Sequence, residues 1–183
     1  MQSTLVVIKP DGVRRGIVGD IIARFERLGL KIVGMKMLRV DDELLKQHYD
    51  KPDEWLAKVG GKLIEFYEQN GKDSREDLGT TEAVEVGKKI LGWLFDYVSS
   101  GPVVAFVVEG YNAVELVRKH TGSTYPLEAA PGTIRGDYHY DSADLANFGK
   151  RAVENIVHSS GSEEEAKFEI GLWFKNDELF SNS

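Results

Sequence analysis

Two short, unbroken apolar runs constrain the fold of this chain more than any other feature. Residues 4–8 read TLVVI and residues 101–110 read GPVVAFVVEG, and both runs are rich in β-branched side chains. Turn-forming residues bound the runs, as is typical of strands, and both are far shorter than the ~20 residues of a membrane-spanning helix. Continuous apolar runs of this length predict two buried strands.

Helical patterns lie beside these strands. Residues 18–28 place apolar side chains at helical spacing and stop at Gly29, whereas residues 31–40 alternate as a further strand does. Further helical patterns cover residues 41–49, 83–98, 112–120 (with Asn112 as the N-cap) and 163–174 (with Ser162 as the N-cap). The sequence therefore predicts an α+β fold: a ferredoxin-like (βαββαβ) sandwich whose antiparallel four-stranded sheet is covered by helices, with helical insertions. Residues 121–144, rich in Gly, Pro, Ser and Thr, are predicted to be a loop.

The composition limits the classes of function. The chain has 183 residues, 42% of them hydrophobic, and a net charge of −7. This length suits one domain, and the acidic charge disfavours nucleic acid and anionic membrane as partners. Cysteine is absent, which excludes disulfides, thiolate nucleophiles and cysteine metal sites. The N-terminus lacks the features of a signal peptide, so we expect a cytoplasmic protein without membrane contact.

Histidine offers the most reactive side chains in the sequence. The four histidines are His48, His120, His139 and His158, and their spacing forms no common zinc motif. His158 stands apart because it ends the apolar stretch NIV and because the small residues SSGS follow it, which leaves room for a substrate. A nucleophilic imidazole needs an acceptor for its N–H, and Ser160 and Glu169 are candidates. The alternatives are a structural histidine, a loop hydroxyl and a solvated helix face.

Three cationic residues are candidates for holding a phosphorylated ligand. Lys9 and Arg135 lie in the glycine- and proline-containing segments KPDG and PGTIRGD, where the backbone can approach a ligand closely. Arg118 lies on the helix that follows the second buried strand. None of these segments matches a P-loop. Each charge considered alone is more typical of a solvated surface.

Six stretches taken together resemble the nucleoside diphosphate kinase family. They are IKPDGVRRGIVGDIIARFERLGLKIVGMK, HY at 48–49, SGPVVAFVVEG, PGTIRGD, NIVHSSGS and EIGLWF, and they cover most of the chain in the family's order. Two residues depart from the pattern: Ser159 replaces the usual glycine, and Gly161 replaces the usual acidic residue. Neither change removes a catalytic group.

The resemblance implies a ping-pong phosphotransferase. The γ-phosphate of a nucleoside triphosphate would pass to His158 and then to a nucleoside diphosphate, with Lys9, Tyr49, Ser160 and Glu169 as the other catalytic residues. The implied nucleotide contacts are Lys9, Ile90, Leu94, Arg118, Thr124, Arg135 and Asn155. Mg²⁺ is the implied cofactor, held mainly by the nucleotide phosphates rather than by protein ligands.

The resemblance also indicates two insertions, at about residues 51–89 and 139–148, within a single domain of residues 1–183. The first insertion falls at the family's helical lid, where Ile90 and Leu94 replace the aromatic wall that stacks on the base. Trp55 or Trp93 could supply a ring instead, although both are equally compatible with core positions. We expect residues 51–89 to form an enlarged lid or an oligomer contact, and the protein to be a hexamer or a tetramer.

Two alternative functions share this fold. One is a non-catalytic nucleotide-binding protein, and the other is a histidine phosphocarrier that accepts phosphate from a protein. The first would lack some of His158, Lys9, Arg118 and Arg135, yet all four are present. The second has no need of two arginines and a threonine suited to a polyphosphate. The sequence therefore favours the kinase.

Overall fold

The computed structural model describes residues 1–180 and is built around a four-stranded antiparallel sheet. The strands are β1 (Gln2–Ile8), β2 (Lys31–Leu38), β3 (Val103–Gly110) and β4 (Val157–Ser159). Their order across the sheet is β2-β3-β1-β4, and each neighbouring pair is antiparallel. This order and the helical connections confirm the predicted ferredoxin-like α+β fold.

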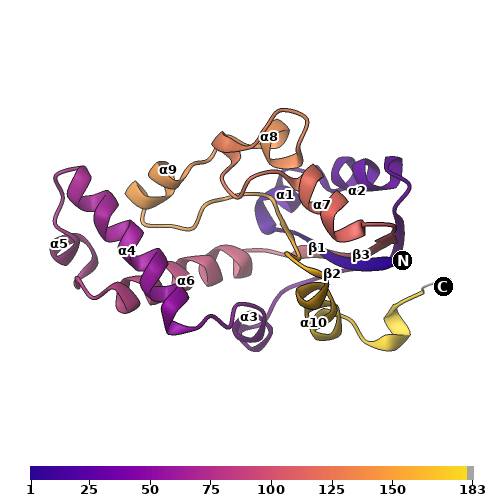
Figure 1. Cartoon of the computed structure of the whole chain (residues 1–183), viewed down its shortest axis with the longest axis horizontal. Coiled ribbons are helices and arrows are strands. Elements are labelled where there is room, and N and C mark those ends of the chain that lie inside the picture. The colour runs from indigo at the N-terminus through magenta and orange to yellow at the C-terminus, as the bar shows by residue number, and fades with distance from the viewer. Residues whose placement is uncertain (181–183) are drawn as a thin grey trace.

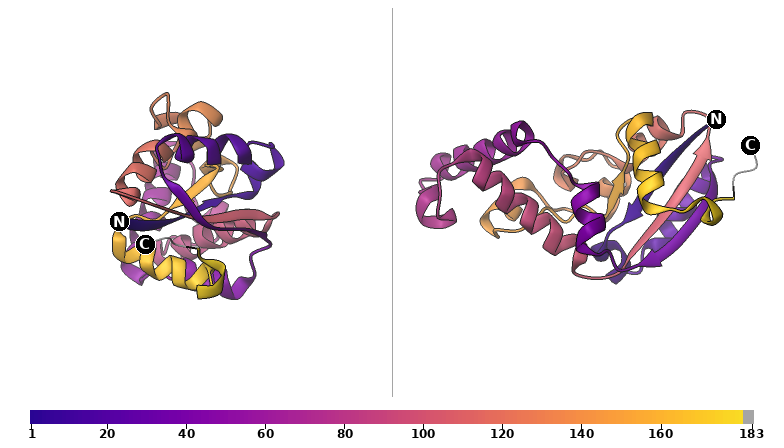
Figure 2. Two further views of the ribbon diagram at one scale, coloured as in Figure 1. Left: turned by 90° about the vertical axis from the view of Figure 1, so that its right-hand side faces the viewer. Right: turned by 90° about the horizontal axis from the view of Figure 1, so that it is seen from below.

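Helices connect and cover the strands (Figure 1). In chain order they are α1 (Pro10–Arg14), α2 (Val18–Arg27), α3 (Asp42–His48), α4 (Asp53–Gln69), α5 (Ser74–Leu78), α6 (Ala83–Ser99), α7 (Ala113–Thr121), α8 (Ile134–Tyr138), α9 (Ala143–Phe148) and α10 (Glu163–Trp173). Two short 3₁₀ turns, η1 (Pro126–Glu128) and η2 (Asn176–Glu178), complete the described elements. Figure 2 shows the sheet between two helical layers.

The continuous apolar character of β1 has a simple cause, because both faces of the strand are covered. Val6 and Ile8 pack with α2 and α7 residues such as Phe25 and Val117 in one core. Leu5 and Val7 belong to a second core on the opposite face, which includes residues of α3, α6 and α10. Alternate side chains of the strand therefore stabilise different layers.

The two regions predicted to be insertions, called the inserted regions below, pack against each other. The first is a hairpin of α4 and α6 that extends away from the sheet (Figure 1) and has its own small core. The second contains α9, whose Phe148 ring lies 4.9 Å from the ring of Phe66 on α4. The Tyr67 hydroxyl donates a hydrogen bond to the carbonyl of Asn147 at 3.2 Å. Segments about 80 residues apart in the sequence therefore form one lobe.

Two local expectations were wrong. Residues 121–144 are not a plain loop, because they contain η1 and α8; the Thr133 side chain starts α8 by accepting a hydrogen bond from the N–H of Gly136. Asn112 does precede α7, but it has a left-handed backbone (φ 53°) and its side chain makes no capping bond. Ser162 caps α10 as predicted. Among the described residues, no helix combines the length and apolarity required to cross a membrane.

Candidate active site

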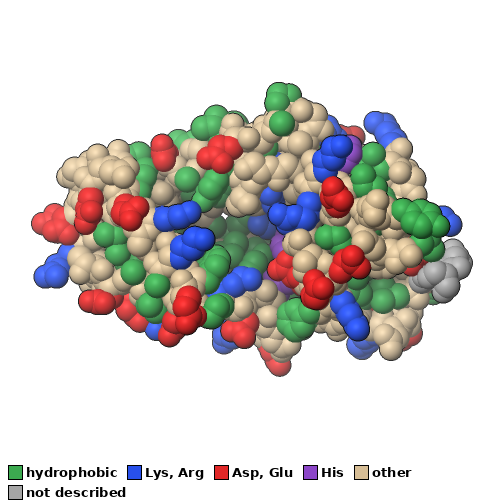
Figure 3. Space-filling model, in the orientation of Figure 1, with side chains coloured by type: hydrophobic (Ala, Val, Ile, Leu, Met, Phe, Trp, Pro, Cys, Tyr) green, Lys and Arg blue, Asp and Glu red, His purple; other side chains and the backbone are tan. Residues whose placement is uncertain are grey.

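A cleft of about 740 Å³ opens where the end of β1, the strand β4 and the helical lobe meet. In Figure 3 a hollow at the middle of the molecule is surrounded by Lys and Arg side chains, with histidine visible at its edge. The predicted site residues that line it are Lys9, Tyr49, Leu94, Arg118, Thr124, Arg135, Asn155, His158 and Glu169. Residues that are widely separated in the sequence thus share one cavity.

His158 lies in β4 at the edge of the sheet, paired in register with Val7. Its Nε2 atom is 2.9 Å from both carboxylate oxygens of Glu169, and the Ser160 hydroxyl donates to the same carboxylate at 2.6 Å. A carboxylate accepts hydrogen bonds and cannot donate one, so it keeps the imidazole proton on Nε2. The other ring nitrogen, Nδ1, therefore carries a lone pair, and within residues 1–180 no group donates a hydrogen bond to it.

The surroundings of His158 keep the ring uncharged. Burial, and then the charge of Lys9, lower the pKa of His158 to about 3. Burial also raises the pKa of Glu169, although His48 and the hydrogen bond from Ser160 oppose this effect. At neutral pH the site thus contains a neutral imidazole, which is the nucleophilic form of the side chain.

His48 is a residue of the cleft that sequence reasoning did not assign to the site. Its ring contacts the ring of His158 edge-on, with 4.5 Å between centroids, and its Nδ1 atom accepts a hydrogen bond from Trp173 Nε1 at 3.1 Å. The ring of Tyr49 lies edge-on to His48 and 6.5 Å from His158. Burial lowers the pKa of His48 to about 3. The only signal in the sequence was its place beside Tyr49, since nothing local indicates that α3 ends against β4.

The backbone just before His158 is strained. Ile156 has φ of 67°, and the N–H of Val157 donates to the carbonyl of Asn155 at 2.7 Å, which closes a γ-turn around it. A β-branched residue with positive φ is a genuine outlier and costs on the order of 1–3 kcal/mol. Two hydrogen bonds hold it: Ile156 N–H donates to the Asp11 carboxylate at 3.0 Å, and its carbonyl accepts from Lys9 N–H at 2.7 Å.

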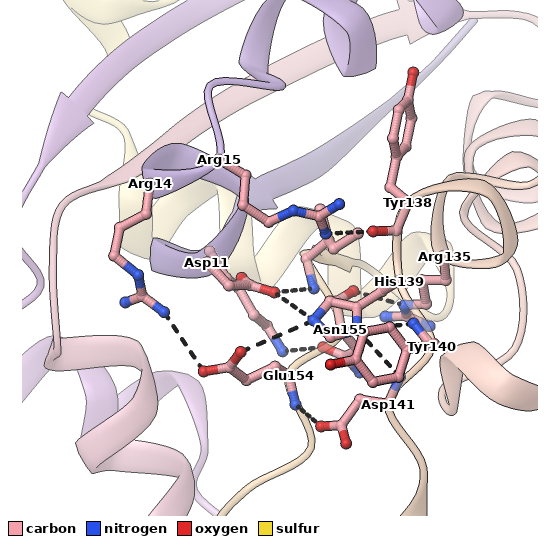
Figure 4. Close-up of polar contacts among 12 residues, drawn as sticks. Asp11, Arg14, Arg15, Arg135, Tyr138, His139, Tyr140, Asp141, Glu154 and Asn155 are labelled. Carbon is pink, nitrogen blue, oxygen red and sulfur yellow. Dashed lines mark hydrogen bonds and ion pairs between the residues drawn. The ribbon is translucent and has the colours of Figure 1, made fainter.

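Residues of the second inserted region support this turn from behind (Figure 4). Nδ1 of His139 accepts the N–H groups of Tyr140 and Asp141 at 2.9 and 3.1 Å, which leaves the ring proton on Nε2. That atom lies 3.9 Å from the Asp11 carboxylate and 3.8 Å from Glu154. Because Nε2 carries the proton, this group of acidic residues and histidine is not suited to ligate a metal.

Asp141 fixes the segment that leads into the turn. Its carboxylate accepts the N–H of Glu154 at 2.8 Å and pairs with both terminal nitrogens of Arg151, at 2.6 and 2.9 Å. Burial alone would raise the pKa of Asp141, but the hydrogen bonds from Arg151 and the backbone outweigh it and lower the pKa. The second insertion is thus connected to the residues directly before Asn155 and His158.

Four cationic side chains line the cleft and differ in burial and in hydrogen bonding. The Lys9 ammonium donates to Asn155 Oδ1 at 2.7 Å, and burial followed by the charge of Arg135 lowers the pKa of Lys9 to about 7. Arg135 donates to the carbonyls of Val157 (2.6 Å), Ser123 (3.0 Å) and Gly122 (3.1 Å), so it also fixes the cleft walls. Arg118 is exposed at the mouth, and Lys51, which sequence reasoning also missed, lines the cleft nearby.

The cleft offers few ligands for a hard cation. Its carboxylates are Glu165 and Glu169, and the latter is already occupied by His158 and Ser160. The Glu165 carboxylate accepts the N–H of Gly161. Mg²⁺ prefers oxygen ligands and is commonly bound through substrate phosphates with few protein carboxylates. This composition fits a metal carried by a phosphorylated ligand.

A second compartment of about 420 Å³ continues from the cleft between the two inserted regions. Lys9, Trp55, Leu94, Thr124 and Asn155 line both spaces. The residues that line only the compartment include Ile90 and Trp93 from α6. Ile90 and Leu94 are therefore placed on one continuous wall, as the alignment of the lid predicts, although their contact with a base stays a prediction.

The fold and the cleft together define an α+β protein with a neutral histidine that contacts a carboxylate. Cationic side chains line the same cleft, which suits a phosphorylated ligand. The family model of nucleoside diphosphate kinase matches residues 2–92 and 71–179. The chain therefore belongs to the nucleoside diphosphate kinase family, and it is an enzyme that transfers phosphate between nucleotides.

Individual relatives agree with this assignment over nearly the whole chain. The chain is 48% identical over 179 residues to the nucleoside diphosphate kinase of Pyrobaculum aerophilum, and the match covers 98% of each chain. It is 42% identical over 180 residues to the nucleoside diphosphate kinase of Pyrococcus furiosus, a match that covers 98% of this chain and 87% of the relative. The crystal structure of the Pyrobaculum aerophilum protein superimposes with a TM-score of 0.93 at 47% identity, covering 98% and 99%. A transition-state mimic of the Borrelia burgdorferi enzyme, with bound vanadate and ADP, gives a TM-score of 0.77 at 38% identity, covering 100% and 92%.

Proposed function

We propose that the transfer proceeds by a ping-pong mechanism in which Nδ1 of His158 is the nucleophile. Nδ1 attacks the γ-phosphorus of a nucleoside triphosphate, the bond from that phosphorus to the bridging oxygen breaks, and the nucleoside diphosphate leaves with the electron pair. A second nucleoside diphosphate then attacks the phosphohistidine in the reverse sense, which regenerates the imidazole. The observation that carries this proposal is the contact of Nε2 with Glu169, because it fixes the tautomer and stabilises positive charge on the phosphorylated ring.

The remaining site residues position and neutralise the phosphates. Phosphoryl transfer depends mainly on alignment and on charge stabilisation, which Lys9, Arg118 and Arg135 supply around the cleft. We assign Thr124 to the phosphates as well. We assign Asn155, which accepts a hydrogen bond from the Lys9 ammonium, to the ribose hydroxyls.

Tyr49 and the remaining polar groups complete the assignment. Tyr49 contacts His48 beside the nucleophile, and burial raises its pKa, so its hydroxyl stays protonated and can donate to a phosphate oxygen. Ser160 acts through Glu169 by anchoring the carboxylate. Mg²⁺ would be bound by the nucleotide phosphates, where it would neutralise charge and orient the transferring group, and no protein side chain is required as its ligand.

The experiment is to incubate the protein with γ-labelled ATP, without acceptor, and to isolate label that is labile to acid and stable to alkali. Addition of GDP should remove this label as GTP. His158→Ala should abolish the label, whereas His120→Ala, a matched control on α7 outside the cleft, should keep it. Persistent label in His158→Ala would refute the assignment of the nucleophile.

The phosphocarrier alternative is less well supported. A carrier meets a phosphoprotein through an exposed histidine, whereas the His158 side chain is 19% exposed and lies inside a cationic cleft. A purified histidine-phosphorylated donor protein that labelled His158 faster than ATP would favour the carrier instead.

We also infer the context in which the enzyme works. We propose a cytoplasmic protein with a single domain over residues 1–183, inserted at about 51–89 and 139–148, that assembles as a hexamer or tetramer. Support for assembly comes from the edge strand β2, where Met35 and Met37 are 55% and 61% exposed. Light scattering tests the subunit number. Deletion of 51–89 tests the lid or oligomer role, which would be refuted by unchanged nucleotide affinity and subunit number.

A further inference from the structure

The compartment between the two inserted regions has walls from both of them. The first insertion and the rest of its hairpin contribute apolar and aromatic side chains, including Leu63, Phe66 and Trp93. The second contributes Ala143, Ala146 and Asn147 of α9. A space of about 420 Å³ with mostly apolar walls falls within the range of small-molecule sites.

The C-terminal end of α9 packs against the helical hairpin. Phe148 of α9 packs edge-on against Phe66 of α4, and Tyr67 donates to the Asn147 carbonyl. Lys150, two residues after the end of α9, pairs with Asp77 of α5 at 2.8 Å. These contacts connect the C-terminal end of α9 and the residues just after it to the helical hairpin.

The compartment also continues directly from the phosphate-binding cleft. Lys9, Thr124 and Asn155 line both spaces, and they are the residues that we assign to the ribose and phosphates. If the phosphates of a nucleotide reach His158 and its ribose contacts Asn155, the base is the remaining part of the nucleotide, and the compartment is the space next to it. A base has flat apolar faces, which matches aromatic and aliphatic walls better than solvent.

We propose that helix α9 forms the outer wall of the nucleobase site and selects nucleotides by the size of their base. This inference rests on the function proposed above and adds a specificity-determining element to it. Ala143 is the informative residue, because its small side chain leaves space in the compartment that a larger one would fill. Purines, which reach further than pyrimidines, should depend on that space most strongly.

The test compares phosphorylation of the enzyme by two donors. γ-Labelled ATP carries a base, whereas labelled phosphoramidate is a small phosphoryl donor without one. Ala143→Trp should slow labelling by ATP by at least about 10-fold, the factor that one base-stacking contact is worth. Labelling by phosphoramidate should change by less than about 2-fold, because His158 is untouched. Leu145→Trp, on the exposed side of α9, is the matched control and should leave both rates unchanged.

Two further measurements keep the inference testable. Ala143→Val narrows the compartment slightly and should reduce kcat/KM for ATP and GTP more than for CTP and UTP. Asn147→Phe reduces the space in the compartment from the next turn of the same helix. Circular dichroism verifies that each variant is folded, and phosphoramidate labelling reports whether the site is intact.

The outcomes separate the two proposals. Equal loss with all four nucleotides, or unchanged ATP labelling in both Ala143→Trp and Asn147→Phe, would overturn the role of α9 while the phosphohistidine mechanism stands. Failure of the unmodified enzyme to label at His158 with either donor would instead overturn the proposed function.

Discussion

The buried Lys9 ammonium predicts a loss of catalytic efficiency as pH rises through neutrality. Burial and the charge of Arg135 lower its pKa to about 7, and Asp11 opposes this only in part. With that pKa the charged fraction falls from about 0.9 at pH 6 to about 0.1 at pH 8 and about 0.01 at pH 9. If the charged form is the one that binds phosphate, kcat/KM should fall by on the order of 100-fold between pH 6 and 9.

The assay measures kcat/KM for ATP across this range, because kcat/KM reports the ionisation of the free enzyme. Lys9→Met removes the charge at every pH, so the ratio of the unmodified enzyme to this variant cancels the titration of the nucleotide phosphates. Lys9→Arg retains a charge throughout and should show no comparable fall. Bound phosphates favour the charged amine, so kcat should stay level to a higher pH than kcat/KM.

A flat ratio of the unmodified enzyme to Lys9→Met between pH 6 and 9 would refute this reasoning. An equal fall in Lys9→Arg would do so as well, because it would assign the titration to another group. Titration of His158 cannot account for a fall in kcat/KM, since its lowered pKa of about 3 keeps the ring neutral from pH 6 to 9.

Three other perturbations test the site and the insertions. Glu169→Gln removes a charge-assisted acceptor and should slow single-turnover phosphorylation of His158 by roughly 10- to 100-fold; an unchanged rate would contradict the tautomer assignment. Asp141→Ala leaves the Glu154 N–H and the half-exposed Arg151 without their carboxylate partner and should cost on the order of 1–3 kcal/mol, measured by urea unfolding at pH 7. Because folding lowers the Asp141 pKa, that difference should shrink as the pH falls below the carboxylate's ordinary value, and a constant difference would count against it. Gly60→Ala places a Cβ 1.9 Å from the Ala83 carbonyl oxygen and should destabilise the hairpin by about 1–3 kcal/mol in the same unfolding assay. Gly61→Ala is the matched control, because its Cβ would meet nothing within 4 Å. It should be neutral or stabilise the protein by up to about 1 kcal/mol. Equal effects at the two glycines would show that the close helix contact is unimportant.

Much of the site was predictable because its chemistry is local. The caps and glutamates of α10 are adjacent to His158 in the sequence, so the spacing from Ser162 already indicated that Glu169 faces the strand end. The location of Lys9 and Arg135 in the cleft was likewise predictable from segments that resemble the family. His48 was missed, because its contact with His158 joins elements 110 residues apart.

The sequence alone predicted the fold, and it singled out His158 as the proposed nucleophile. Continuous apolar strands require cover on both faces. His158 was singled out by the small residues that follow it and by the resemblance to the family. Only the tertiary structure decided which imidazole nitrogen is bare, how far Lys9 loses its charge, and that the two insertions enclose one compartment. Tautomer and pKa depend on burial and on through-space partners, and packing between helices depends on side-chain shape, so none of these is encoded in a local pattern.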